Sequence, residues 1–281
     1  PFTIYEGVHK VPPAHYLVCE GDGVTVSRYW DPVAHAHEQR PRSDADAVAE
    51  LEALLGTAVR QRMIADVPLG AFLSGGIDSS LVVALMREHA GEPVRTFTIS
   101  FDQPAYNEAD HAEAVARHLG TEHSEHRCGD GEMLYVIDRL PTMYDEPFAD
   151  SSAVPTYLVS RTARARVTVA LSGDGGDELF FGYPRYRYHA GASRLGRLPR
   201  PVRRAMAAVA ERLPHPRIRR AAAVLRNDEE DSYARFIAWL SPGEIEALTG
   251  GRAMDAPLYA DARARSQGLS HADQPGLLDL V

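Results

Sequence analysis

The chain has 281 residues, 44% of them apolar and 25% charged, with a formal net charge of -9 at pH 7. This composition is typical of a soluble globular protein with one large core and a smaller appendage. No apolar run of about eighteen residues occurs and no basic-then-apolar leader opens the sequence, so we expect no membrane partner and a cytoplasmic location.

The cysteines and the two ends of the chain carry further expectations. Cys19 and Cys128 lie far apart without metal-ligand spacing, so we expect free thiols rather than a disulfide or a zinc site. The sequence begins with Pro1 and stops inside the apolar run 277–281, which suggests a piece cut from a longer protein.

Residues 1–43 are rich in proline and contain a hairpin pattern. Strands over 15–20 and 24–30 flank a Gly-Asp-Gly turn, because glycine and aspartate favour tight turns. An Arg-Pro-Arg run ends this pattern, and Ser43 or Asp44 can cap the helix that follows. We therefore place a domain boundary near Ser43.

A buried strand, a glycine turn and a helix start follow one another over residues 67–81. The Ser-Gly-Gly turn at 74–76 leaves the backbone bare, so its N–H groups can face an anion, and a helix starting at Ser79 directs its positive end the same way. Asp78 stands where a Walker loop would place lysine, which indicates a divalent metal between carboxylate and phosphates. The alternative is a turn that only joins a strand to a helix.

Strands and helices then alternate at the spacing of βαβ units. We expect a helix over 79–89, a strand over 94–101, a helix over 107–119 closed by Gly120, a weaker strand over 122–126, helical segments to Arg164, and a strand over 167–171. This order favours a parallel sheet with helices on both faces, where ligands collect at the carboxyl ends of the strands.

The region after residue 185 is helical and rich in arginine. Residues 199–247 show no strand signal, and residues 185–226 hold twelve arginines against the single acid Glu211. Either these arginines bind nucleic acid or they form a solvated helix face. The scarcity of interleaved aromatics and the acidic total charge favour the solvated face, so we expect no nucleic acid partner.

The strand over 167–171 runs directly into a second acidic glycine loop, Ser-Gly-Asp-Gly-Gly-Asp-Glu, at residues 172–178. Because parallel strands share a carboxyl edge, the two loops are expected to form a metal–nucleotide cleft in which Asp78 and Asp177 hold Mg²⁺ on a triphosphate. A calcium loop is the alternative, but the spacing of an EF-hand is absent.

The two loops in this order, 74–80 and 172–183, resemble the synthetase domain of glutamine-hydrolysing asparagine synthetase, a PP-loop ATP pyrophosphatase. Segments 96–99, 106–108, 119–123 and 145–148 with Ser151-Ser152 look similar too. The resemblance implies an α/β, HUP-like fold with a parallel sheet and helices on both faces, a small N-terminal β hairpin and a helical C-terminal part. Residues 1–43 would be the remnant and linker of a preceding glutaminase domain, and 44–281 a truncated synthetase domain that is helical after about 190.

The resemblance also implies individual roles. The cofactors would be ATP and Mg²⁺, with Leu73 and Ile99 around the adenine and Ser172 and Gly173 near the adenosine. Pyrophosphate would be bound by Ser74, Gly75, Gly76, Asp78, Ser79 and Ser80, and the metal by Asp78 and Asp177. Asp174, where many relatives carry glutamate, would help to form the acyl-adenylate together with Asp177. Asp145, Glu146 and Ser151 or Ser152 line the amino-acid side or form only a helix-terminating turn.

The implied reaction joins an aspartate side-chain carboxylate to AMP with release of pyrophosphate, after which ammonia from glutamine displaces AMP. The glutaminase cysteine is missing, since position 1 is Pro1, and no lysine follows Lys10 where the family uses one for amide formation. We therefore expect a fragment that binds ATP without completing turnover; a homodimer is one candidate assembly. The alternatives are a β-lactam synthetase or lasso-peptide cyclase type of ligase acting on another carboxylate, or a non-catalytic ATP-binding module.

Overall fold

The computed structural model describes residues 3–31, 34, 43–103, 107–148, 150–187, 198–212, 225, 246–248 and 250. The chain divides into two compact units. The first comprises Pro1–Pro12 and Arg40–Asp174, and the second comprises Pro13–Gln39 and Gly175–Val281.

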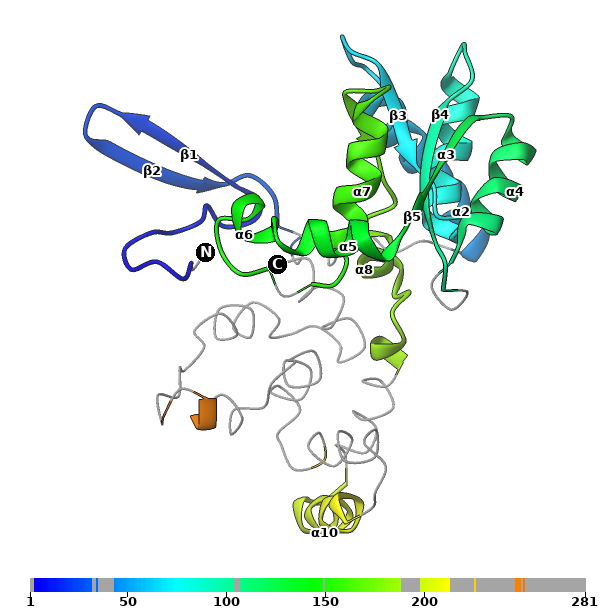
Figure 1. Cartoon of the computed structure of the whole chain (residues 1–281). Helices are drawn as coiled ribbons and strands as arrows, with labels where there is room; N and C mark the ends of the chain where they lie inside the picture. Colours follow the sequence, from blue (N-terminus) through cyan, green and yellow to red (C-terminus); the bar gives the residue numbers. More distant parts are fainter. Residues whose placement is uncertain are drawn as a thin grey trace. The chain divides into compact units, whose positions relative to one another are not determined.

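A parallel sheet of four strands forms the centre of the first unit (Figure 1). Its strand order is β5-β4-β3-β6, so the chain moves outward from β3 to β5 and then returns to the other side of β3. The order of the strands therefore reverses beside β3, and such a switch point is where open α/β sheets bind ligands. The strands are β3 (Leu69–Phe72), β4 (Arg95–Phe101), β5 (Glu122–Cys128) and β6 (Val169–Leu171).

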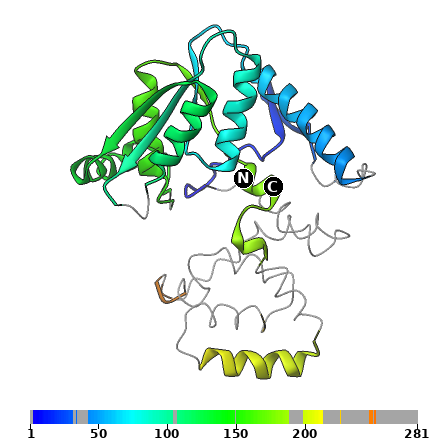
Figure 2. The same ribbon diagram turned by 90° about the vertical axis from the view of Figure 1, so that its right-hand side faces the viewer.

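Helices cover both faces of this sheet, as the sequence predicts (Figures 1 and 2). Ala71 of β3 and Leu73, which directly follows this strand, belong to a core cluster with residues of α2, α3 and α4. Phe72 of β3 and Phe97 of β4 pack instead with Ala163 of α7, because successive side chains of a strand point to opposite faces. The helices are α2 (Asp44–Arg62), α3 (Ile77–His89), α4 (Ala109–Leu119), α5 (Asp130–Ile137), α6 (Leu140–Met143) and α7 (Ala153–Arg164).

The predicted helix ends are close to the observed ones. The Ser43 hydroxyl caps α2 by accepting a hydrogen bond from the Asp46 amide at 3.2 Å, which decides between the two candidate caps. Gly120 follows α4 in the left-handed conformation, as expected. The helix after the first loop begins at Ile77 instead of Ser79, because extended Gly76 is already its N-cap.

Two strands differ in length from the prediction. β6 begins at Val169, since the Val167 amide donates to Ala163 of α7 and the Thr168 amide donates to Pro68. β5 continues to Cys128 because it stays paired with β4 up to Phe101. The polar sequence of β5 carries little strand signal, and pairing with β4 overrides it.

A polar cluster joins β5, α5 and α7. Glu132 of α5 lies 3.0 Å from His126 Nε2 of β5 and forms an ion pair with Arg161 of α7. The hydrogen bond from Arg161, followed by the one from His126, lowers the pKa of Glu132 below its ordinary 4.5. A lowered carboxyl pKa stabilises the fold above pH 4.5, and this stabilisation is lost as the pH falls through the folded-state value.

We expect Glu132→Gln to lower the free energy of unfolding at neutral pH by at most about 1 kcal/mol, because the side chains are partly exposed. The deficit should vanish in acid, below the pKa of Glu132 in the fold. Urea unfolding at several pH values measures it. Glu113→Gln, which removes an exposed pair with Arg117 on α4, is the matched control, and a pH-independent deficit at Glu132 would refute the explanation.

The second unit contains the N-terminal hairpin and the segments after the second loop. The antiparallel hairpin pairs β1 (His15–Glu20) with β2 (Gly23–Arg28), close to the predicted bounds. α8 (Gly176–Phe180) is short, and α10 (Arg200–Glu211) confirms the start of the predicted helical region; most of residues 213–247 lie outside the described residues. On α10 the arginines at 200 and 204 are exposed, but Arg203 is buried, so the solvated face does not include every arginine.

Cys19 is exposed and Cys128 is buried, and neither forms a disulfide in the described part of the chain, as predicted. In the described part of the chain, no helix has the length and apolar content that crossing a membrane requires.

Candidate active site

The first loop joins β3 to α3 and is braced by its own serines. The Ser74 and Ser79 hydroxyls lie 2.9 Å apart, and the Ser74 amide donates to Ser79 Oγ. The Gly76 amide donates to Ser74 Oγ at 3.2 Å. The Ser79 side chain is thus used inside the loop, which the sequence motif does not reveal. The amides of Ile77 and Asp78, in the first turn of α3, have no helical acceptor and can face an anion.

Gly75 is the position in this loop where only glycine fits. Its φ is +82°, a conformation that L side chains rarely adopt. A Cβ at Gly75 would lie 2.6 Å from the Ala112 amide nitrogen and from the His111 carbonyl carbon of α4. The loop therefore lies directly against the start of α4, and its shape depends on the missing side chain.

The second loop meets the first at Gly173, which follows β6. A Cβ on Gly173 would be 2.7 Å from the Ser79 amide nitrogen and 3.0 Å from Asp78 Cβ. Such a close approach places the backbone of residues 172–174 against the first turn of α3. The two loops predicted from sequence to share an edge are thus in contact within the first unit.

Asp174 and Ser172 brace the second loop. The Ser172 hydroxyl donates to Asp174 Oδ2 at 2.9 Å and accepts from the Asp174 amide at 3.4 Å. Both side chains remain partly exposed at the carboxyl end of β6. They can therefore reach a ligand without a change in the sheet.

The residues predicted to bind adenine and pyrophosphate differ in which of their atoms are accessible to a ligand. Leu73 is 1% exposed and faces the α3–α4 core, so only its backbone is available to a ligand. Ile99 packs toward α5 and α7 on the other face. Ser80 Oγ is buried and has no hydrogen-bond partner among the described residues, so the loop as it stands does not present this oxygen to a ligand.

The metal prediction depends on two carboxylates. The Asp78 carboxylate, at the start of α3, has no hydrogen bond or ion pair with another described residue. Asp177 lies in α8 of the second unit, so the pairing of the two carboxylates stays a prediction. Within the described residues, no group of three histidine, cysteine, aspartate or glutamate side chains could hold an ion. Mg²⁺ commonly binds one or two carboxylates plus phosphate and water oxygens, so Asp78 fits such an ion only together with a nucleotide.

Within the second unit, Tyr183 holds the carboxylate of Glu178, the residue directly after Asp177. Its hydroxyl donates to Glu178 Oε1 at 2.9 Å, and Arg185 stacks 3.7 Å above its ring centroid. Burial, followed by the bond to Glu178, raises the pKa of Tyr183 to about 12. A phenol pKa raised from 10 stabilises the fold below pH 10, and the stabilisation is lost as the pH rises through about 12.

We expect Tyr183 to ionise near pH 12, above the ordinary tyrosine value of about 10. Alkaline titration of phenolate absorbance should show that Tyr183→Phe removes an absorbance step near pH 12. Tyr16→Phe, at an exposed position of β1, is the control and should leave the absorbance step near pH 12 in place. Loss of a step near pH 10 in the Tyr183 variant would contradict the assignment.

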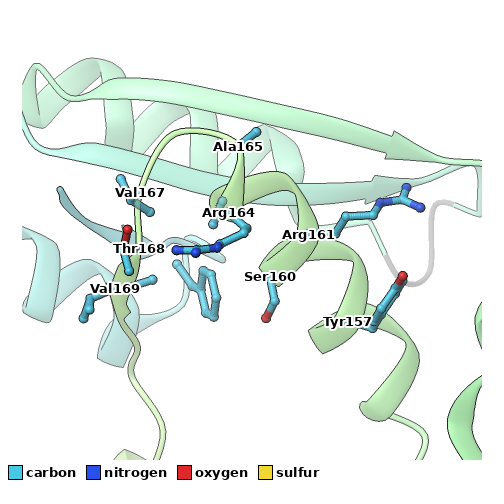
Figure 3. A pocket seen from close by; sticks show the side chains of 11 residues that line it. Tyr157, Ser160, Arg161, Arg164, Ala165, Val167, Thr168 and Val169 are labelled. Carbon is cyan, nitrogen blue, oxygen red and sulfur yellow. The ribbon is translucent and has the colours of Figure 1, made fainter. Parts of the chain in front are cut away.

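Two pockets lie in the first unit, and the first contains Ser151 and Ser152, which the resemblance places on the amino-acid side. One of about 490 Å³ lies where β4 and β5 end, and Ser151 and Ser152 at the start of α7 line it together with Phe101, Met133 and Val154. No lysine or arginine is among its described lining residues. The other, about 660 Å³, lies beside β6 and the end of α7, where Arg164 reaches across it (Figure 3).

The parallel sheet, with helices on both faces and a glycine loop beside its switch point, defines the class as an α/β domain. A family model described as asparagine synthase matches residues 50–273. The chain therefore belongs to the asparagine synthase family.

Individual relatives agree. A Mycobacterium tuberculosis protein provisionally named a glutamine-hydrolyzing asparagine synthetase is 33% identical over 93% of this chain and 42% of its own length. Asparagine synthetase (glutamine-hydrolyzing) 1 of Bacillus subtilis is 33% identical over 76% of this chain and 33% of its own length. The chain thus spans less than half the length of these relatives. The alignment with the solved NH3-dependent NAD synthetase of Campylobacter jejuni covers 69% of this chain and 98% of the synthetase chain, at 14% identity and with a TM-score of 0.36.

Proposed function

We propose that this chain carries the ATP-activating half of an amide-forming ligase of the asparagine synthetase type. The observation that supports this most is the contact of Gly173 with Ser79 and Asp78, because it joins two acidic glycine loops at the switch point of the sheet. A carboxylate would attack the α-phosphorus of ATP, an acyl-adenylate would form, and pyrophosphate would leave.

The residues of the first loop would bind the leaving pyrophosphate. The amides of Ile77 and Asp78 and the positive end of α3 would face the place where negative charge builds during this displacement. The Ser74–Ser79 hydroxyl pair would hold the loop in this shape before ATP arrives. Binding that strengthens as charge develops lowers the barrier, because it favours the transition state over bound substrate.

Asp78, with Asp177 as the resemblance implies, would hold Mg²⁺. The ion, when bound, neutralises charge on the phosphates. Asp174, fixed by Ser172, lies next to Gly173 and would orient the acyl group during adenylation.

Aspartate is the acid that the family description favours, and the whole protein would take ammonia released from glutamine by a glutaminase domain. A second candidate is a carboxylic acid with an apolar body. The 490 Å³ pocket at the ends of β4 and β5 favours it, because its described lining is mainly apolar and offers no cation for the α-carboxylate of an amino acid.

The test is ATP/pyrophosphate exchange with a panel of acids that includes aspartate, glutamate and short aliphatic acids. Only the acid that is adenylated drives exchange. Exchange with aspartate supports the first candidate, and exchange with an aliphatic acid alone supports the second. ATP binding without exchange for any acid would refute activation and leave a non-catalytic module.

A further inference from the structure

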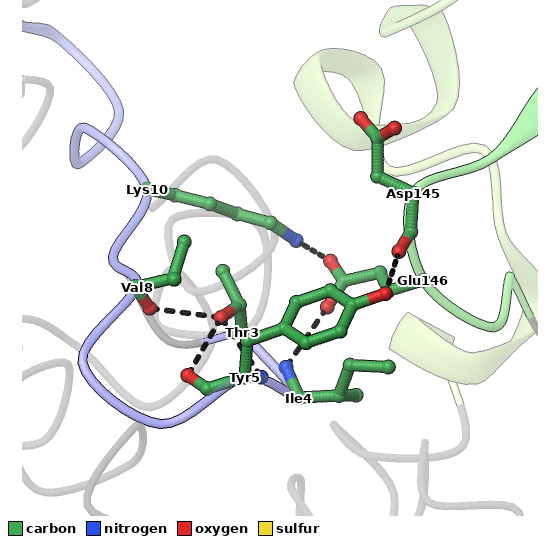
Figure 4. Close-up of polar contacts among 7 residues, drawn as sticks. All are labelled: Thr3, Ile4, Tyr5, Val8, Lys10, Asp145 and Glu146. Atoms are coloured by element: carbon green, nitrogen blue, oxygen red, sulfur yellow. Dashed lines mark hydrogen bonds and ion pairs between the residues drawn. The ribbon is translucent and has the colours of Figure 1, made fainter.

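The N-terminal segment of residues 3–10 forms a compact turn that is braced from within (Figure 4). The Thr3 hydroxyl lies 2.8 Å from the Val8 carbonyl oxygen and 3.2 Å from the Tyr5 carbonyl oxygen. The Tyr5 amide donates to Thr3 Oγ1, and the Val8 amide donates to the Tyr5 carbonyl. The segment therefore has a defined shape of its own before it contacts anything else.

Three contacts attach this turn to residues 145 and 146, which lie far away in the sequence (Figure 4). The Tyr5 hydroxyl donates to the Asp145 carbonyl at 2.8 Å. The Ile4 amide donates to Glu146 Oε2 at 3.3 Å, and Lys10 forms an ion pair with Glu146 Oε1. The hydrogen bond from Lys10 also lowers the pKa of Glu146, so this carboxylate is charged when the pair forms.

Residues 145 and 146 lie a few positions before Ser151 and Ser152, which line the pocket at the ends of β4 and β5. Tyr144 and Phe148 stack across them with ring centroids 4.7 Å apart. The Ser152 amide donates to Asp150 Oδ1, and α7 begins at Ala153. Ser151 and Ser152 line this pocket together with the polar residues Asp102 and Gln103. Because the two serines follow the 145–148 turn closely in the sequence, the position of this turn affects where their hydroxyls lie.

We propose that residues 3–10 act as a strap that positions the 145–148 turn, and that Lys10 and Tyr5 are positioning residues for the acid-binding pocket. In this strap the single lysine of the sequence, Lys10, pairs with Glu146, so the Glu146 carboxylate is already occupied. A surface ion pair alone contributes little, but three contacts from a braced turn act together. The effect on the acid substrate rests on the proposed function; the effect on the turn does not.

Hydrogen exchange of the 281-residue chain tests the strap. In the double variant Tyr5→Phe/Lys10→Met, amides of residues 144–153 should exchange at least about tenfold faster, while amides of β3 and β4 keep their rates. Each single variant should show part of this effect. Lys10→Arg, which keeps the positive charge, should keep the protection of the wild type. Tyr16→Phe in the exposed hairpin is the matched control and should change nothing.

ATP/pyrophosphate exchange, measured at increasing concentrations of the carboxylic acid substrate, adds a functional readout on the full protein. The double variant should raise the KM for the acid several-fold and leave kcat and the ATP affinity unchanged. Unchanged hydrogen exchange of the amides of residues 144–153 in the double variant would overturn the strap. An equal loss of protection over the whole first unit would also overturn it, because that result indicates a general structural role. If wild-type protein adenylates no acid, the proposed function fails, and hydrogen exchange still decides whether the strap exists.

Discussion

A Gly75→Ala variant is expected to lose most of its affinity for ATP and to unfold more easily than the wild type. The added Cβ would sit 2.6 Å from backbone atoms of α4 on a residue with φ of +82°. Forcing a non-glycine residue into such a conformation costs about 1–3 kcal/mol, and the clash adds to it. The loop must move away from α4, which disturbs the amides of Ile77 and Asp78. Isothermal titration with ATP and urea unfolding measure the two effects.

Gly91→Ala is the matched control for this variant. Gly91 has open space around its Cβ position and no positive φ, so the substitution should leave both affinity and stability near the wild-type values. If Gly75→Ala bound ATP as tightly as Gly91→Ala, the first loop could not be the ATP site that we propose.

An Asp78→Asn variant is expected to lose Mg²⁺-dependent binding of ATP by on the order of 100-fold, about 2.7 kcal/mol. Asparagine keeps the size of the side chain but removes the charge that would hold the ion. Binding of AMP, which lacks the β- and γ-phosphates, should change little. Titrations of ATP and AMP with and without Mg²⁺ separate the two nucleotides.

Asp110→Asn offers a control in the same kind of position, because Asp110 also lies in the first turn of a helix, α4. It should leave Mg²⁺-dependent binding unchanged. Equal affinity of the Asp78 variant and the wild type for ATP in the presence of Mg²⁺ would rule out Asp78 as a metal ligand.

The sequence predicts most of the first unit because its strands carry apolar or β-branched residues and its helix ends carry capping residues. Ser43 and Gly120 are such local signals, and both stand where predicted. β5 is the exception: its extent depends on pairing with β4, a contact between segments that no local pattern records. β6 is shorter than its apolar run because Val167 bonds to α7.

The candidate site is predicted at the level of the loops but not of individual side chains. The motif identifies residues 74–80 and 172–178. The strands before these loops, β3 and β6, are neighbours in the sheet, so both loops start from the same edge. It does not reveal that the Ser79 hydroxyl bonds to Ser74, because that bond depends on how the loop folds over the first turn of α3. The link from Lys10 to Glu146 joins segments far apart in the sequence, so no local pattern predicts it.

Hydrogen exchange with and without ATP and Mg²⁺ tests the central claim most directly, since it reports on both loops at once. We predict slower exchange for the amides of residues 74–80 and 172–174 when ATP is bound, and no change in the hairpin of β1 and β2. If ATP binds and neither loop is protected, or if protection is confined to the pocket beside β6, the two loops are not the ATP site and the proposed function is wrong.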